Sequence, residues 1–172
     1  YPLVGPVVFS EIQFRPTNSY LGDTHAGEFL ELLNLNSNAV ALFDPAALTN
    51  TWRIAGGVNF DIPANLTLGA GKTLLLVSFD PSANPDELEW FRSAYGISAG
   101  VTVLGPWTGA LADEGEGVKL LRPDPPQLPP HPDAGFVPYV LVEQVRYLPT
   151  PPWATNGLSA GASLQRIVPS CF

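Results

Sequence analysis

Short runs of apolar or alternating residues, broken by Gly, Pro, Asn and Asp, make up most of the chain. Alternation of apolar and polar side chains is typical of a half-buried β-strand, and the residues between the runs are turn formers. The pattern predicts about ten strands, which favours a β-sandwich or barrel over repeated βαβ units. The predicted strands are residues 6–14, 28–34, 39–43, 52–55, 59–62, 72–79, 101–104, 117–122, 139–147 and 162–168.

Two segments rich in turn formers separate predicted strands. Residues 34–38 read Asn-Leu-Asn-Ser-Asn, which predicts a hairpin connection. Residues 66–71 read Leu-Thr-Leu-Gly-Ala-Gly and predict a turn before the next strand.

One segment breaks the β pattern. The sequence Asn-Pro-Asp-Glu at 84–87 supplies a cap, a proline for the first helical position and an acid three residues after the cap. Leu88, Phe91 and Tyr95 follow at helical spacing, and Gly96 is a suitable terminator. We expect one short helix that packs on the sandwich by that apolar face.

A second irregular segment, residues 123–138, contains seven prolines. Because proline lacks a backbone donor, this segment cannot be a central strand, and we expect an extended loop over the surface. The chain therefore reads as a single domain over residues 1–172, with inserts at about 80–106 and 123–138.

Nine short segments of the chain, taken in order, carry a resemblance to a known family. They are VFSEI at 8–12, GEFLELLN at 27–34, WRI at 52–54, FDIP at 60–63, LGAGKTL at 68–74, LADEGEGVKLLR at 111–122, VEQVRY at 142–147, PW at 152–153 and GASLQR at 161–166. As an ordered set, which covers most of the chain, they resemble the lamin tail domain family. The two inserts depart from that family's pattern.

The resemblance implies an immunoglobulin-like β-sandwich. In nuclear lamins such a domain follows a long coiled coil, and in bacteria it is a non-catalytic module of secreted or surface-anchored multidomain proteins. The family has no catalytic motif to carry over. The resemblance thus predicts a bacterial, extracellular module rather than an enzyme.

Composition and charge narrow the choice of partner. The 172 residues suit one domain, and a hydrophobic content of 45% is too high for a disordered chain. Acidic residues outnumber basic ones 16 to 8, for a net charge of -8. This balance argues against nucleic acid or an anionic membrane surface, because phosphate binding needs a basic face. No apolar run approaches the ~18 residues that a membrane span needs.

Cys171 is the one cysteine, so the chain cannot form an internal disulfide. Its position suits an intermolecular disulfide, and a free terminal thiol is the alternative. The chain begins at Tyr1 and has no Met, which we interpret as a mature or excised segment.

Two acidic loops are weak candidates for calcium, which takes oxygen ligands. The first holds Asp23 and Glu28, and the second holds Asp113, Glu114 and Glu116. The histidine between the first two acids also allows a base held by a carboxylate. Neither loop has the fixed spacing of an EF-hand, so polar surface loops are the alternative. We expect no other cofactor.

Three aromatic residues are candidates for stacking on sugar rings. Trp90 falls outside the apolar face of the predicted helix, Trp107 follows Gly-Pro in a loop, and Tyr139 begins a strand. The alternative is that these aromatics hold their loops on the domain. Trp52, by contrast, is predicted to lie in the core.

The sequence favours a non-catalytic extracellular module with a structural, adhesion or assembly role, acting on other protein modules or on itself. The run 7–14 is the predicted site of strand addition by a partner. A second hypothesis is a glycan-binding module that targets an attached enzyme to polysaccharide. A hydrolase is a third, and it needs acidic residues clustered in a cleft.

Overall fold

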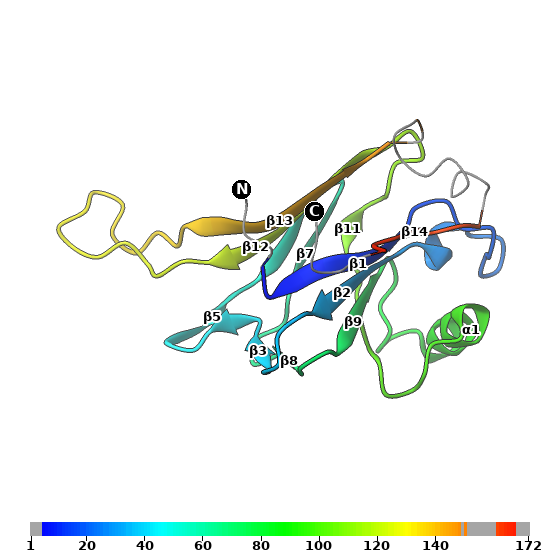
Figure 1. The fold of residues 1–172 in the computed structure, drawn as a ribbon, viewed down its shortest axis with the longest axis horizontal. Helices are drawn as coiled ribbons and strands as arrows, with labels where there is room; N and C mark the ends of the chain where they lie inside the picture. The colour runs from blue at the N-terminus through cyan, green and yellow to red at the C-terminus, as the bar shows by residue number, and fades with distance from the viewer. Residues whose placement is uncertain (1–4, 149, 151–160, 168–172) are drawn as a thin grey trace.

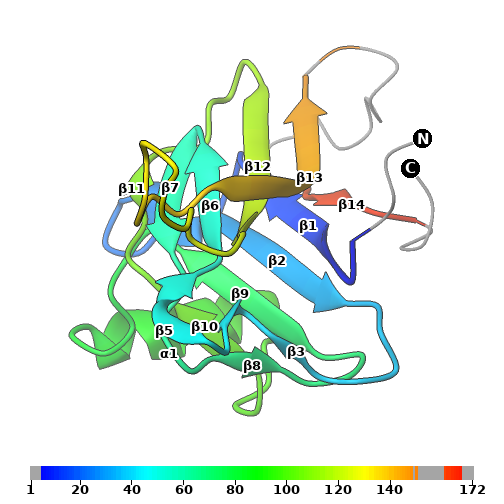
Figure 2. The same ribbon diagram turned by 90° about the vertical axis from the view of Figure 1, so that its left-hand side faces the viewer.

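The computed structural model describes residues 5–148, 150 and 161–167, and it confirms an all-β sandwich with one short helix (Figure 1). Two five-stranded sheets face each other around the main core. Figure 2 shows them from one end of the molecule.

The first sheet has the strand order β10-β9-β2-β1-β14 and the second has the order β11-β7-β6-β12-β13. The first contains β1 (Val7–Gln13), β2 (Phe29–Asn34), β9 (Thr73–Val77), β10 (Thr102–Leu104) and β14 (Leu164–Gln165). The second contains β6 (Arg53–Gly56), β7 (Val58–Asp61), β11 (Thr108–Gly109), β12 (Glu116–Pro123) and β13 (Tyr139–Tyr147). Two small ladders pair β3 (Val40–Ala41) with β8 (Thr67–Leu68) and β4 (Phe43–Asp44) with β5 (Ala47–Thr51).

The central strand β9 of the first sheet is buried on both faces, which explains its continuous apolar run. In β9, Leu74 and Leu76 face the core between the sheets, whereas Leu75 and Val77 face a second core under the helix. The alternation of a strand therefore divides one leucine run between two cores. Trp52 lies in the core between the sheets, as predicted.

The predicted helix is confirmed as α1 (Pro85–Tyr95). Phe91 is fully buried, and Gly96 ends the helix with a left-handed φ of 66°. The strands on either side of α1, β9 and β10, run parallel to each other. They form a βαβ unit, because a parallel pair needs a crossover connection. The expectation of a sandwich without such a unit was therefore wrong at this point.

Three local predictions are corrected. Residues 34–38 do not join a hairpin, because β2 pairs with β1 and β9 while β3 pairs with β8. The buried Asn34 side chain bonds the carbonyl oxygens of Asn38, Leu68 and Gly69, so the segment is a fixed corner. Part of the predicted turn 66–71 is strand β8. In the run 7–14, β14 pairs with Glu11 and Ile12 on the side of β1 away from β2, and the Phe9 backbone bonds Glu143 and Arg166, so the edge is occupied at these positions.

Residues 123–138, which we call the arm, do not run over the surface. They continue β12 and β13 as a hairpin that projects from the sandwich (Figure 1). The Asp124 N–H donates to the Pro138 carbonyl oxygen, and the Gln127 N–H donates to that of Phe136, each at 2.9 Å. The arm extends outward because these cross-strand hydrogen bonds continue the β12–β13 ladder between its prolines.

Of the predicted strand 162–168, the described residues form only β14, which has two residues. Cys171 lies outside the described residues, so its predicted intermolecular disulfide stays a prediction. Within the described ranges, no helix has the length and apolar character needed to cross a membrane.

Candidate functional site

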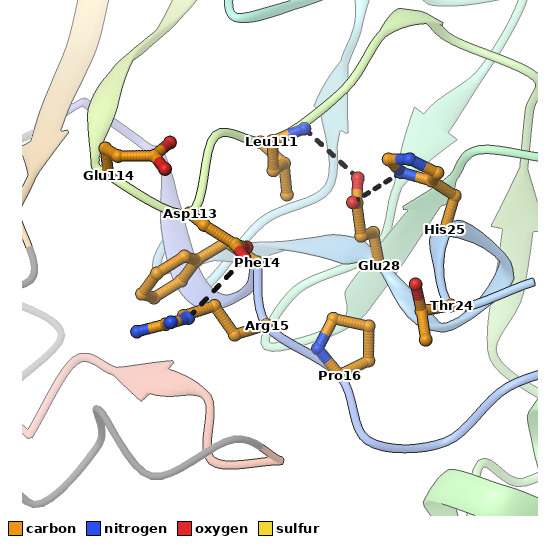
Figure 3. Close-up of a pocket in the computed structure, with 9 residues that line it drawn as sticks. All are labelled: Phe14, Arg15, Pro16, Thr24, His25, Glu28, Leu111, Asp113 and Glu114. Carbon is orange, nitrogen blue, oxygen red and sulfur yellow. Dashed lines mark hydrogen bonds and ion pairs between the residues drawn. The ribbon is translucent and has the colours of Figure 1, made fainter.

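A pocket of about 520 Å³ opens at the opposite end of the long axis from the arm (Figures 1 and 3). Three loops build it: the residues after β1, the 3-10 turn η1 (His25–Gly27) with its flanks, and the segment before β12. The lining residues are Phe14, Arg15, Pro16, Thr24, His25, Glu28, Leu111, Asp113 and Glu114.

Glu28 is the most enclosed charged group in the pocket wall, with a side chain only 5% exposed. Its carboxylate accepts the Leu111 N–H at 3.1 Å and lies 2.7 Å from Nδ1 of His25. Burial raises the pKa of Glu28 above its ordinary value, while the Leu111 N–H and His25 oppose that rise and Asp113 adds to it. A carboxylate placed in this way fixes the geometry of the wall around it.

The η1 turn presents His25 toward solvent and Glu28 toward the interior. The Gly27 N–H donates to the Thr24 carbonyl oxygen at 2.9 Å, and the Asp23 carboxylate accepts the His25 N–H at 2.9 Å. The His25 side chain is 59% exposed. Because Glu28 holds the ring through Nδ1, the polar atom that His25 can offer to a ligand is Nε2.

The second acidic loop is held from inside the molecule. The Glu116 carboxylate accepts the Ala112 N–H at 2.7 Å and lies 3.1 Å from the Tyr147 hydroxyl. Tyr147 is fully buried, and burial followed by the negative charge of Glu116 raises its pKa. Glu116 therefore shapes the turn, while Asp113 and Glu114 line the pocket.

The two loops proposed separately for calcium meet at this pocket. Glu28, Asp113 and Glu114 line it, whereas Asp23 and Glu116 are not in its lining. Asp113 lies 3.8 Å from Nε of Arg15, so it has a cationic neighbour within the chain. In the ranges that the structure describes, no three His, Cys, Asp or Glu side chains are grouped to hold a metal ion.

The alternative of a base held by a carboxylate has the required contact, because His25 meets Glu28 (Figure 3). Sequence reasoning missed Arg15, Phe14 and Leu111. No motif marks these three residues, and only the tertiary fold brings them to the pocket.

The exposure predicted for sugar stacking is contradicted at Trp107, whereas Trp90 and Tyr139 are partly buried. Trp107 is only 5% exposed and belongs to the core between the sheets. Trp90 is half-buried against the helix cluster, with its ring 5.6 Å from that of Tyr20. Tyr139 stacks under the Arg53 guanidinium, 3.7 Å from the ring centroid. Each ring is thus engaged with the domain, in a different part of it.

A different surface is apolar and exposed. Leu128 and Phe136 on the arm are 75% and 62% exposed, and Val140 and Leu141 follow them in β13. We call Leu128 and Phe136 the arm patch, because Val140 and Leu141 are neighbours in one strand and point to opposite faces of the sheet. β13 is the last strand of its sheet, and residues 125–132 of the arm contain no Asp, Glu, Lys or Arg.

Comparison with protein-family models finds no match to this chain, and comparison with curated proteins finds none either.

Proposed function

We propose that this chain is a non-catalytic, extracellular β-sandwich module of the lamin tail type, which assembles through contacts between its arms. The observation that carries the proposal is the arm patch, an apolar surface on a projecting hairpin. The ordered segments that resemble the lamin tail family support the module type and its place in secreted or surface proteins.

The occupant that fits the arm patch is the arm patch of a second copy. Leu128 follows Gln127, whose N–H donates to the Phe136 carbonyl oxygen, so the two exposed side chains occupy neighbouring positions of one hairpin. Exposed apolar surface of this kind on a soluble domain marks an interaction site. Two copies of a chain with a net charge of -8 repel each other, and residues 125–132, between Asp124 and Asp133, contribute no Asp, Glu, Lys or Arg to that repulsion. Because the arm projects from the sandwich, two copies joined through their arms keep their acidic sandwiches apart. Salt then screens the repulsion between charges that are more than about 8–10 Å from each other. A two-fold contact between equal patches also closes on itself as a dimer.

The contact is one of side-chain packing rather than strand addition. Seven prolines in the arm lack the backbone donor that an added strand would use. Proline also restricts the free chain, so ordering the arm on binding costs less. This form of assembly replaces the strand addition predicted at residues 7–14, where β14, Glu143 and Arg166 already occupy part of the outer edge.

Light scattering after size exclusion tests the proposal on three proteins: the unchanged chain, a Leu128→Ser/Phe136→Ser variant and a Leu21→Ser/Ile167→Ser control. The control removes two apolar side chains that are even more exposed but lie outside the arm. We expect the unchanged chain and the control to dimerise with rising concentration, while the arm variant stays monomeric. A monomeric unchanged chain would overturn the proposal, as would a control that behaves like the arm variant.

A further inference from the structure

We propose that the pocket beside Glu28 binds a neutral, polyhydroxylated ligand, namely a sugar residue. This inference does not depend on arm assembly, because the pocket and the arm lie at opposite ends of the molecule. It places a glycan site at a cavity that the two acidic loops and the residues after β1 line together, rather than at Trp90, Trp107 and Tyr139.

The size and rigidity of the pocket suit a small ligand. A volume of about 520 Å³ lies in the range of roughly 300–1,000 Å³ that ligand pockets occupy. Its deepest polar group, Glu28, is already bonded to Leu111 and His25. A ligand that enters therefore pays little to order the wall.

The wall offers both donors and acceptors of hydrogen bonds. Arg15 supplies N–H donors, and Asp113 and Glu114 supply carboxylate acceptors. Thr24 and His25 can act in either role. A sugar hydroxyl is one donor and two acceptors at once, so neighbouring hydroxyls match such a mixed wall. The Pro16 ring adds an apolar surface for the C–H face of a sugar.

The charges of the pocket disfavour the other ligand classes. Three carboxylates face one guanidinium, so an anionic ligand meets net repulsion. A metal ion needs several ligands directed at one point, and among the described residues no three His, Cys, Asp or Glu side chains are grouped in that way. A neutral ligand meets neither obstacle.

His25 gives this site a direct reporter. The chain has two histidines, so an NMR spectrum of the imidazole rings is simple, and a His131→Gln variant assigns it. The probes are glucose, galactose and N-acetylglucosamine, each as the free sugar, together with cellohexaose and chitohexaose. The free sugars and the hexamers distinguish recognition of one unit from recognition of a glycan chain.

We expect at least one probe to shift the His25 ring signals in a saturable manner and to leave those of His131 unchanged. Loss of one charge-assisted hydrogen bond to the sugar weakens binding by about tenfold or more, which is the expected effect of Glu114→Gln. This substitution, at an exposed wall position, tests the site without disturbing a buried group. The control Glu89→Gln changes an exposed acid outside the pocket and should leave the affinity unchanged.

The proposal is wrong if no probe shifts the His25 signals. It is also wrong if Glu114→Gln, in a folded protein, binds as tightly as the unchanged chain. Calcium chloride and a lysine tripeptide are tested in parallel. A response of His25 to either one, without a response to the sugars, would overturn the ligand class.

Discussion

Two buried glutamates, Glu143 and Glu28, occupy comparable positions with different consequences. Glu143 on β13 accepts the Phe9 N–H at 2.5 Å and forms an ion pair with Arg166. Nε of Arg166 donates to the Phe9 carbonyl oxygen at 3.1 Å, so the pair satisfies both polar groups of one residue in β1. Glu28 also accepts one backbone N–H, from Leu111, but its second partner is His25.

The difference lies in the second partner. Arg166 is permanently charged and its side chain is 15% exposed, so the joint at Glu143 is closed. The His25 side chain is 59% exposed, so the contact at Glu28 stays open to solvent. Burial raises the pKa of both carboxyl groups, and yet only one of them borders a pocket. In this fold, access to the partner, rather than burial of the acid, distinguishes the pocket from the structural joint.

The largest expected effect on stability is the loss of the ion pair between Glu143 and Arg166. Glu143→Ala leaves Arg166 and the Phe9 N–H without this partner, and removing one member of a buried ion pair costs about 3–5 kcal/mol. Urea unfolding measures the loss, with Gln144→Ala as the control at the exposed neighbouring position. A loss as small as that of the control would show that Glu143 does not join the sheets.

A smaller loss of stability is expected when Glu28, which contacts the exposed His25, is replaced. Glu28→Ala leaves the buried Leu111 N–H unpaired, at a cost of about 1–3 kcal/mol, while His25 is free to turn to water. The same urea measurement compares the two alanine variants directly. Equal losses of stability for Glu143→Ala and Glu28→Ala would contradict the difference drawn between these two glutamates.

The third variant, His25→Gln, removes the exposed partner. Exposed ion pairs contribute about 0–1 kcal/mol, so we expect the free energy of unfolding to fall by no more than that. Sugar binding should nevertheless weaken, because the rim of the pocket changes. A loss of stability as large as that of Glu28→Ala would indicate that His25 holds the fold.

The smallest expected effect is on the pH dependence of stability. Because the pKa of Glu28 is raised in the folded state, that state binds more protons than the unfolded chain between pH 4.5 and the raised value. Stability from this group is therefore complete below pH 4.5 and is lost as the pH rises through the raised pKa. In a His25→Gln background, where no imidazole titrates nearby, adding Glu28→Gln should flatten this fall. An unchanged slope in urea unfolding over that pH range would contradict the burial of an ionisable Glu28.

Local pattern predicted much of the fold. The strand at 139–147 and the helix around Phe91 match the structure because alternation and helical spacing are properties of neighbouring residues. The parallel pairing of β9 with β10 was missed, since it depends on residues far apart in the sequence. The direction of the arm was missed for a similar reason, because it follows from the ladder of β12 and β13 rather than from its prolines.

The pocket was predictable only in pieces. The acids of both loops, and the pairing of a histidine with a carboxylate, were visible as local motifs. The hydrogen bond from the Leu111 N–H to Glu28 joins segments that are distant in the sequence, so no local sequence pattern predicts it. Exposure of Trp107 was predicted from its loop position, and the fold instead placed it in the core.

Sedimentation velocity on the unchanged chain, at low and at high salt, tests arm assembly most directly. The proposal predicts a dimer at both salt concentrations, and a tighter one at high salt, because salt screens the repulsion between acidic bodies and does not weaken apolar contacts. A monomer under both conditions, or a dimer that dissociates at high salt, would contradict assembly through apolar contacts between the arms.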